Sequence, residues 1–187
     1  MNLLLEHRWE HALVAAVIEA ASKSNGGSYL GRTAMQKLMY FLQVLNVPMR
    51  FKFRIHHYGP FSDELADTLD WLQADDVIED RSRETRYSNY APGENWHEIK
   101  SRFQSDLGQY QEMIDAVAKA MGGMDPDQLE LIATLDFCYR WVHARGGNGP
   151  WKELTIQKFK QIKGDKFTDS KISDSYDRLA RVKLIQQ

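Results

Sequence analysis

Residues 31–60 read GRTAMQKLMYFLQVLNVPMRFKFRIHHYGP, and residues 61–80 continue as FSDELADTLDWLQADDVIED. The first segment holds five basic residues and no acidic one, whereas the second holds eight acidic residues and no basic one. Apolar residues recur at helical spacing on both sides of the turn at residues 56–62. The stretch therefore predicts a basic helix and strand that turn sharply into an acidic helix.

Local signals predict where these elements begin. Thr33 is placed as a helix N-cap with Gln36 three residues later, which is the spacing of a capping box. Alternating apolar and polar residues over 51–56 predict a strand with one buried face. Ser62 is placed to cap the acidic helix after Pro60 ends the strand, and the apolar face of that helix is expected to include Leu65, Leu69 and Leu72, with Ala66 and Trp71 beside them.

Outside this stretch, the N-terminal region completes a winged-helix-like order of elements. Residues 5–24 are predicted to form the first helix, which stops at the Asn25-Gly26-Gly27 glycines. A strand is expected at Val77-Ile78, a polar turn at residues 81–84, a return strand at residues 85–88 and a loop at residues 89–95. The turn at residues 81–84 corresponds to the wing.

The second half of the chain is predicted to be helical. One helix is expected over residues 96–121, and a second begins at Asp125-Pro126, where an acidic cap precedes proline at the first helical position. Two further helices are expected over residues 151–162 and 170–183. The fold class is thus mainly α with a small antiparallel β-sheet: a winged-helix-like part (residues 1–95) and a helical part (residues 96–187) packed on it as one structural unit.

Composition limits the classes of protein that the chain can represent. The formal net charge is −2 and 43% of the residues are hydrophobic, so a nucleic-acid surface would have to be a local patch on a molecule with a substantial core. The single cysteine, Cys138, lies in an apolar helical run and is predicted to be a buried small hydrophobe. No apolar run reaches the roughly 20 residues of a membrane span, and no signal-peptide pattern is present. We therefore expect a cytoplasmic protein with no membrane partner.

Two sets of charged residues are candidate binding residues. The basic set can contact phosphate or form a solvated face, and it comprises Arg32, Lys37, Lys52 and Arg54 with Arg81, Arg83 and Arg86 of the wing. The acidic set, Asp63, Asp67 and Asp70, shares one helical face in the position where a winged helix enters DNA. Because that face would repel phosphates, it favours a basic protein partner over DNA.

Histidines supply the other candidates. Strand alternation places His57 on the apolar face and His56 on the polar one, and we expect His57 and Tyr58 to hold the turn, with a binding role as the alternative. His7 and His11 match the H-x-x-E-H zinc-protease pattern, but the sequence defines no third ligand. We predict no catalytic residue, no metal and no cofactor.

Four segments carry a resemblance to a known family: GRTAMQKLMYFLQ, FRIHHYGPFSDELADTLDWL, LELIATLDFCYRW and FKQIKGDKFTDSKISDSYDRLARVKLI. Together they resemble the YwgA-like bacterial proteins, which look related to the Panacea, or SocA-like, domain of antitoxins and phage-associated proteins. The most specific pieces are Gln36-Lys37 before Leu38-Met39-Tyr40, and Tyr58-Gly59-Pro60. The matched positions are largely core and turn residues.

The resemblance implies a mainly helical fold and direct binding of another protein, such as a toxin or defence protein. We therefore predict a non-enzymatic protein-interaction module, antitoxin-like or associated with phages and mobile elements; the alternative is a winged-helix DNA-binding transcription regulator, and an enzyme ranks third. The oligomeric state stays open. The predicted binding residues, for protein or nucleic acid, are Arg32, Lys37, Arg54, His56, His57, Tyr58, Asp63, Asp67, Arg81, Arg83 and Arg86.

Overall fold

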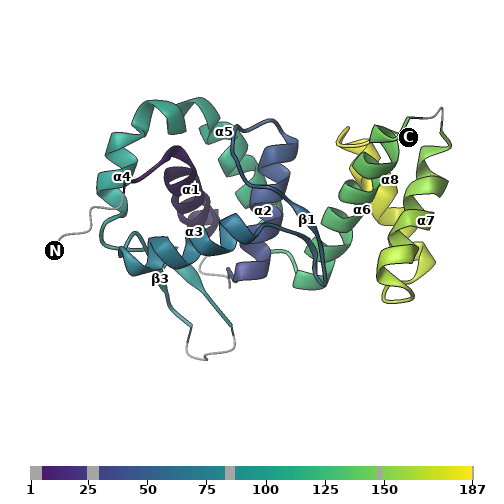
Figure 1. The fold of residues 1–187 in the computed structure, drawn as a ribbon, viewed down its shortest axis with the longest axis horizontal. Coiled ribbons are helices and arrows are strands. Elements are labelled where there is room, and N and C mark those ends of the chain that lie inside the picture. Colours follow the sequence, from purple (N-terminus) through teal and green to yellow (C-terminus); the bar gives the residue numbers. More distant parts are fainter. Residues whose placement is uncertain (1–5, 25–29, 83–86, 147–148, 187) are drawn as a thin grey trace. The chain divides into compact units, whose positions relative to one another are not determined.

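A computed structural model describes residues 6–24, 30–82, 87–146 and 149–186 (Figure 1). Within these ranges the chain forms eight helices and four three-residue strands, which confirms the predicted class of a mainly α protein with a small β component. In chain order the elements are α1 (Trp9–Ser24), α2 (Arg32–Val44), β1 (Arg54–His56), β2 (Gly59–Phe61), α3 (Asp63–Ala74), β3 (Ile78–Asp80), β4 (Tyr90–Pro92), α4 (Trp96–Arg102), α5 (Gln104–Met121), α6 (Pro126–Ala144), α7 (Trp151–Lys163) and α8 (Asp169–Arg181).

Contacts divide the chain into two compact units, and each is described by itself. The first unit contains residues 1–53 and 61–124, and the second contains residues 54–60 and 125–187. Helices α4 and α5 thus belong by contact to the first unit, although they follow residue 95. The division into parts 1–95 and 96–187 stays a prediction about folding units.

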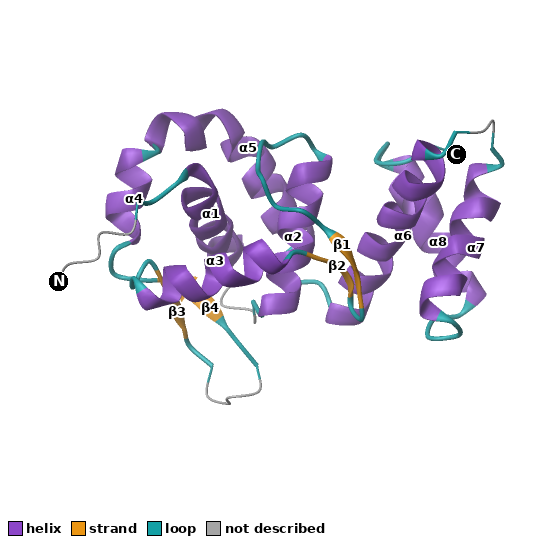
Figure 2. Cartoon of the chain, in the orientation of Figure 1, coloured by secondary structure: helices purple, strands orange, loops and turns teal. Residues whose placement is uncertain are grey.

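The first unit is built around α1, which is apolar on nearly all sides. Leu13, Val14, Val17 and Ile18 are completely buried because α2, α3, α4, α5 and β4 all pack against this helix. Figure 2 shows α1 in the middle of these elements. The helix begins at Trp9 rather than near residue 5, and the predicted glycine stop at residues 25–27 lies outside the described residues.

Two helix predictions in this unit were wrong. Helix α2 begins at Arg32 with Gly31 as its N-cap, so Thr33 lies inside the helix and caps nothing. The Gln36 side chain is instead buried against Ser62: its Nε2 donates to the Ser62 carbonyl at 2.9 Å, and the Ser62 N–H donates to its Oε1 at 2.8 Å. The single helix expected over residues 96–121 is broken at Phe103, which separates α4 from α5.

The β3–β4 pair lies in the first unit, and its second strand differs from the prediction. Strand β4 covers residues 90–92, which were expected to be loop, and Ile78 pairs with Pro92 in antiparallel register. The buried Tyr90 explains the shift, since its backbone N–H donates to the Leu30 carbonyl at 2.9 Å. The expected strand at residues 85–88 lies partly outside the described residues, and Tyr87 and Ser88 form no strand.

The second unit is a packed trio of helices with a short hairpin. Asp125 caps α6 as predicted, since its carboxylate accepts from the N–H groups of Asp127 (2.9 Å) and Gln128 (3.4 Å). Helices α7 and α8 pack on α6 around the buried Phe159 and Tyr176. Cys138 is buried as expected, and burial raises the pKa of its thiol to about 12.

The strand expected over residues 51–56 is shorter than predicted and has a different partner. Only residues 54–56 form β1, which pairs with β2 across a tight turn. The described strands thus form two separate two-stranded sheets, β1–β2 and β3–β4, whereas a winged helix needs one sheet. None of the helices in the described ranges is long and apolar enough to cross a membrane.

Candidate functional site

Helix α3 carries the acidic surface that the sequence singled out, and its start is well determined. The Ser62 hydroxyl accepts a hydrogen bond from the Leu65 N–H at 3.3 Å, so Ser62 caps the helix as predicted. The same hydroxyl donates to Glu64 at 2.7 Å, and this hydrogen bond lowers the pKa of the Glu64 carboxyl. Acidic residues in the first turn also interact favourably with the positive end of the helix dipole. The helix is therefore stable despite its charge.

The buried and exposed sides of α3 follow its periodicity. Leu65, Leu69 and Leu72 are at most 1% exposed and join the core of the first unit. We define the α3 acidic face by four of the exposed residues of this helix, and these are Asp63, Asp67, Asp70 and Trp71. Trp71 is 55% exposed, which corrects its expected place beside the apolar face. It lies two residues beyond Leu69, which is about 200° around the helix axis.

Part of this face is neutralised by the basic helix α2. The guanidinium of Arg32 pairs with both carboxylate oxygens of Asp70, which stands 58% exposed. Arg32, near the start of the basic segment, thus neutralises one carboxylate of the acidic segment. Asp63 and Asp67 extend the carboxylate row towards the start of the helix.

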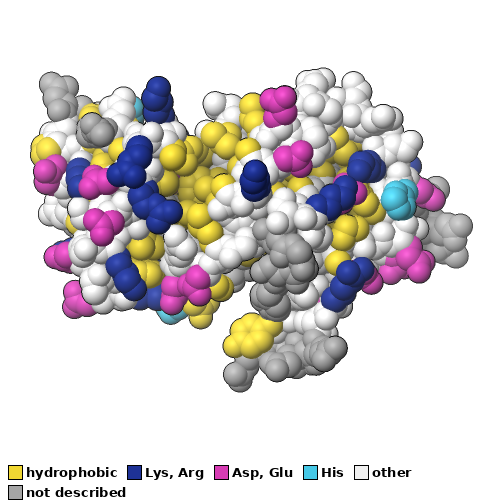
Figure 3. Space-filling model, turned by 180° about the vertical axis from the view of Figure 1, so that it is seen from behind, with side chains coloured by type: hydrophobic (Ala, Val, Ile, Leu, Met, Phe, Trp, Pro, Cys, Tyr) yellow, Lys and Arg dark blue, Asp and Glu magenta, His cyan; other side chains and the backbone are white. Residues whose placement is uncertain are grey.

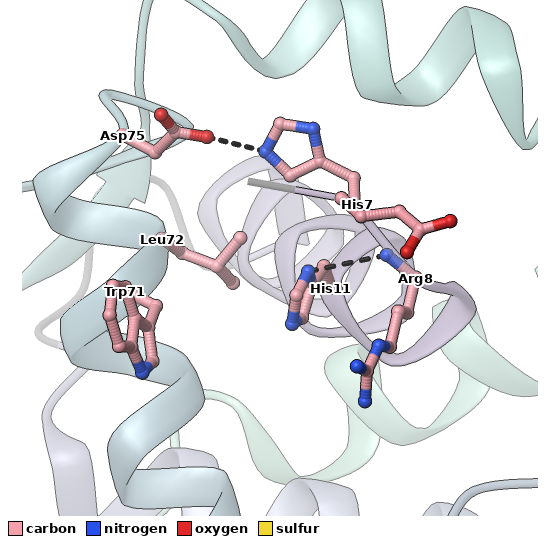
Figure 4. Close-up of a pocket in the computed structure, with 7 residues that line it drawn as sticks. His7, Arg8, His11, Trp71, Leu72 and Asp75 are labelled. Carbon is pink, nitrogen blue, oxygen red and sulfur yellow. Dashed lines mark hydrogen bonds and ion pairs between the residues drawn. The ribbon is translucent and has the colours of Figure 1, made fainter. Parts of the chain in front are cut away.

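A hollow of about 270 Å³ opens beside Trp71 at the C-terminal end of α3. It lies between α3 and the residues that lead into α1, and its lining comprises Glu6, His7, Arg8, His11, Trp71, Leu72 and Asp75 (Figure 4). His7 Nε2 lies 2.5 Å from Asp75 Oδ2, so the two side chains form a direct hydrogen-bonded pair across the hollow. The lining thus combines an aromatic wall, a histidine–carboxylate pair and one arginine.

The surroundings of His11 favour its neutral form over its protonated form. Its Nδ1 accepts a hydrogen bond from the Arg8 N–H at 3.3 Å, which leaves the proton of the neutral ring on Nε2. Burial lowers the pKa of His11, and the positive charges of His7 and Arg8 lower it further. Figure 4 shows this hydrogen bond and the one between His7 and Asp75 as dashed lines.

His7 and His11 of the H-x-x-E-H pattern make the hydrogen bonds described above. Because His7 precedes the first residue of α1, the two histidines are not on consecutive turns of one helix, and their rings meet edge to face with centroids 6.0 Å apart. No group of three or more histidine, cysteine or acidic side chains suited to a metal occurs in the described part of the chain.

The turn after α3 positions Asp75. Asp76 adopts a left-handed conformation (φ 53°), and its carbonyl accepts from the Asn95 N–H at 2.9 Å. The Asn95 side chain donates to the Asp75 carbonyl at 3.0 Å. Gly93 passes so close that a Cβ atom there would lie 2.3 Å from the Asp76 oxygen. These contacts fix the position of Asp75, whose carboxylate is hydrogen-bonded to His7.

The predicted basic set is not brought together. Within the first unit, Arg32 pairs with Asp70, Lys37 is buried at 1% exposure, and Arg81 pairs with Glu79. Arg54 lies in the second unit, and Arg83 and Arg86 lie outside the described residues. The paired arginines are already neutralised by carboxylates within their own unit.

The turn His56-His57-Tyr58 belongs to the second unit, and all three side chains are exposed. His57 was expected on the apolar face, and this was wrong because the strand ends at His56 and the chain turns there. The turn is held through its backbone: Lys163 Nζ donates to the His57 carbonyl at 2.6 Å. The Lys166 ammonium also lies 5.9 Å from the centre of the Tyr58 ring.

A buried carboxylate anchors those two lysines. Glu130 is 2% exposed and lies 2.9 Å from both Lys163 Nζ and Lys166 Nζ, and the Lys163 side chain is itself only 5% exposed. A buried charge of this kind is stable only when it is paired. Lys163 and Lys166 thus connect the turn at residues 56–58 to Glu130 of α6.

Sequence reasoning did not place Trp71 or Asp75 in a site, and it considered His7 only as part of the H-x-x-E-H pattern. Trp71 was assigned to the core, and His7 and Asp75 are 68 residues apart. The acidic residues on either side of Trp71 were the local sequence signal that could have indicated a binding surface here.

Comparison with known proteins gives one informative similarity. Over 63 residues this chain is 36% identical to the "Uncharacterized protein YwgA" of Bacillus subtilis (strain 168). The match spans 34% of this chain and 35% of that protein, so it covers about a third of each. It supports the YwgA-like part of the resemblance. No protein-family model matches the chain.

Proposed function

We propose that this protein is a non-enzymatic protein-interaction module that binds a basic segment of a partner protein through the α3 acidic face. The observation that carries the proposal is Trp71, which is 55% exposed on a helix whose outer positions are acidic. Tryptophan is one of the residue types that dominate binding energy at protein interfaces.

The chemistry of this face matches lysine and arginine. A cationic side chain over the Trp71 indole gains a cation–π interaction, and neighbouring carboxylates add charge-assisted hydrogen bonds. The hollow beside Trp71 offers depth for one long side chain, with the Asp75 carboxylate in its lining. The same carboxylates disfavour DNA, because they would face phosphates if α3 entered a groove.

The alternative is a winged-helix DNA-binding regulator, and the described residues give it less support. Two of the arginines that it needs, Arg32 and Arg81, are engaged with Asp70 and Glu79. On the face drawn in Figure 3, lysine and arginine side chains are interspersed with acidic ones instead of forming one basic field. A phosphate-binding surface works best as a continuous basic stripe.

The antitoxin-like role and the association with phages or mobile elements rest on the resemblance to the Panacea, or SocA-like, domain. In that role the basic partner is a toxin or a defence protein, and binding masks a basic surface that the partner needs for its own activity. The acidic face supplies the charge complementarity that such masking requires.

The experiment is capture of partners from native lysate on the tagged full-length chain, with nuclease added throughout. We compare wild type with Trp71→Ala and with the double variant Asp63→Lys/Asp67→Lys. The matched control is Asp106→Lys/Glu112→Lys, which makes the same charge change on the exposed side of α5 in the same unit, with Asp106 also in a first helical turn. Circular dichroism and thermal unfolding check that each variant is folded.

We expect a basic protein that is retained after nuclease treatment, reduced roughly 10-fold by either α3 variant and unchanged in the α5 control. Equal loss in the control would show that net charge, and not the α3 face, governs binding. Recovery of nucleic acid alone, with everything lost on nuclease treatment, would replace the proposal with the DNA-binding alternative.

A further inference from the structure

The second unit exposes a tryptophan with the opposite electrostatic setting. Trp141 on α6 is 36% exposed, and two cations lie over its ring. The Arg145 guanidinium carbon is 3.9 Å from the ring centre, and the Lys158 ammonium of α7 is 4.1 Å from it. We call Arg145, Trp141 and Lys158 the cationic stack.

The geometry of the stack decides what it can bind. Both cations lie within 4.1 Å of the same ring centre, so the stack concentrates positive charge beside an aromatic ring. Carboxylates form the strongest hydrogen bonds with such cations. The stack is therefore suited to an acidic partner.

Neither cation has a carboxylate partner among the described residues, in contrast to other bases of this unit. Lys152 pairs with Asp177, Lys160 with Asp169, and Lys163 with Glu130. Lys158 makes one long contact of 3.5 Å to the neutral amide of Gln161. Leu154, one helical turn before Lys158 on α7, is 37% exposed and adds apolar surface. The surface thus offers two unneutralised cations and an apolar contact.

We propose that the cationic stack binds the α3 acidic face of a second copy of this chain. This rests on the proposed function, since it names the partner of the α3 acidic face. The chain carries both halves of the contact: a helix whose exposed side presents Asp63, Asp67 and Trp71, and a surface with two cations and exposed apolar atoms. Charge complementarity of this kind fixes register and favours the right partner.

The contact has a defined symmetry and salt response. Two different surfaces meet, so the contact is heterologous, and it closes into a small ring or continues as an open chain. Because Arg145, Asp63 and Asp67 are exposed and Lys158 is only partly buried, salt screens these charges, and self-association is expected to weaken as ionic strength rises. A copy that is engaged in this contact has its acidic face covered, so a more basic partner must displace it.

The test is sedimentation velocity of the full-length chain over a wide range of concentration, at low and at physiological ionic strength. Two charge variants are compared: Arg145→Glu/Lys158→Glu in the stack, and Asp63→Lys/Asp67→Lys in the face. Their controls are Lys171→Glu/Arg178→Glu on the exposed side of α8 and Asp106→Lys/Glu112→Lys on α5. Trp141→Ala removes the ring without changing charge.

We expect wild type and both controls to self-associate at low salt, and each charge variant to sediment as a monomer. Trp141→Ala should weaken self-association on the order of 30-fold, as for an interface hot spot. An equimolar mixture of the two charge variants should associate again, because the unaltered acidic face of one variant then meets the unaltered stack of the other, and the reversed stack meets the reversed helix. This rescue distinguishes the contact from general loss of folding.

Three results would overturn the proposal. The first is a wild type that is monomeric at every concentration, and the second is self-association that neither charge variant changes. The third is binding of single-stranded oligodeoxythymidine by a monomeric wild type and its loss in Arg145→Glu/Lys158→Glu, which would make the stack a nucleic-acid surface. In each case, partner capture lost in Asp63→Lys/Asp67→Lys would still support the proposed function, so the two failures are separable.

Discussion

The two units each expose one tryptophan in a charged setting, and the settings are opposite. Trp71 lies among carboxylates that come from its own helix, whereas Trp141 lies close to Arg145, which caps the end of its own helix, and to Lys158 of α7. The first setting is a consequence of local periodicity, and the second needs two helices packed side by side. We thus propose partners of opposite charge for the same residue type, because its charged neighbours differ in sign.

The largest expected effect comes from weakening the second unit alone. Glu130→Ala leaves the Lys163 ammonium buried without its carboxylate, and breaking a buried pair in this way costs about 3–5 kcal/mol of unfolding free energy. Urea denaturation measures the loss. The control Asp177→Ala removes a half-exposed partner of Lys152 and should cost at most about 1 kcal/mol.

This prediction also sharpens the comparison between the two tryptophans. Capture of a partner through the α3 acidic face should be unchanged in Glu130→Ala, since Glu130 belongs to the other unit. Similar losses for Glu130→Ala and Asp177→Ala would mean that the buried ionic network contributes little stability.

A smaller effect is expected at the turn that supports the hollow beside Trp71. Gly93→Ala places a Cβ atom 2.3 Å from the Asp76 carbonyl oxygen, and because that oxygen is backbone the chain must shift. Overpacking of this kind costs about 1–3 kcal/mol, and the shift should loosen the His7–Asp75 pair. Urea denaturation measures the stability change.

Gly108 in α5 is a matched control for this substitution. No atom lies within 4 Å of a Cβ placed there, and the position is helical. Gly108→Ala should therefore stabilise the protein by about 0.5–1 kcal/mol. The two substitutions are predicted to change stability in opposite directions, and a Gly93→Ala protein as stable as wild type would contradict the close crossing at Asp76.

The smallest expected effect is a pH dependence confined to the first unit. Because burial and neighbouring positive charge lower the pKa of His11 below its ordinary value of 6.5, the unfolded chain binds this proton more readily than the folded one. The stability that His11 contributes is therefore present above pH 6.5 and is lost as pH falls from 6.5 towards the folded pKa.

Replacing His11 with glutamine removes this titration. We expect the unfolding free energy of His11→Gln to change less between neutral and mildly acidic pH than that of wild type, as measured by urea denaturation at each pH. A wild type and variant with the same pH profile would show that the His11 environment does not set it.

The sequence predicted much of the α3 surface because the signals there are local. Ser62 precedes the first turn, and the leucines at 65, 69 and 72 recur at helical spacing, so both the cap and the buried side follow from neighbouring residues. Trp71 was misplaced because its size and apolar character favour burial, although its angular position on the helix indicated exposure. The position of a residue around the helix was the better guide in this case.

Other predictions failed where a contact outside the predicted element competed with a local signal. The Thr33–Gln36 spacing fits a capping box, but Gln36 satisfies two backbone groups of Ser62, which lies 26 residues away. The alternation at 51–56 fits a strand, but the hydrogen-bonded part is shorter and pairs with the chain just after its own turn. In both cases hydrogen bonds to residues outside the predicted element decided the local structure.

By itself, the amino-acid sequence determined the mainly helical class, the acidic outer side of α3 and the caps at Ser62 and Asp125, because these depend on residues within one or two helical turns. Tertiary structure alone decided that His7 meets Asp75, that Glu130 and Lys163 hold the His57 turn, and that Lys158 reaches Trp141. The physical reason is that these contacts join residues far apart in the chain, whose meeting depends on how complete helices pack and not on the propensity of any one segment.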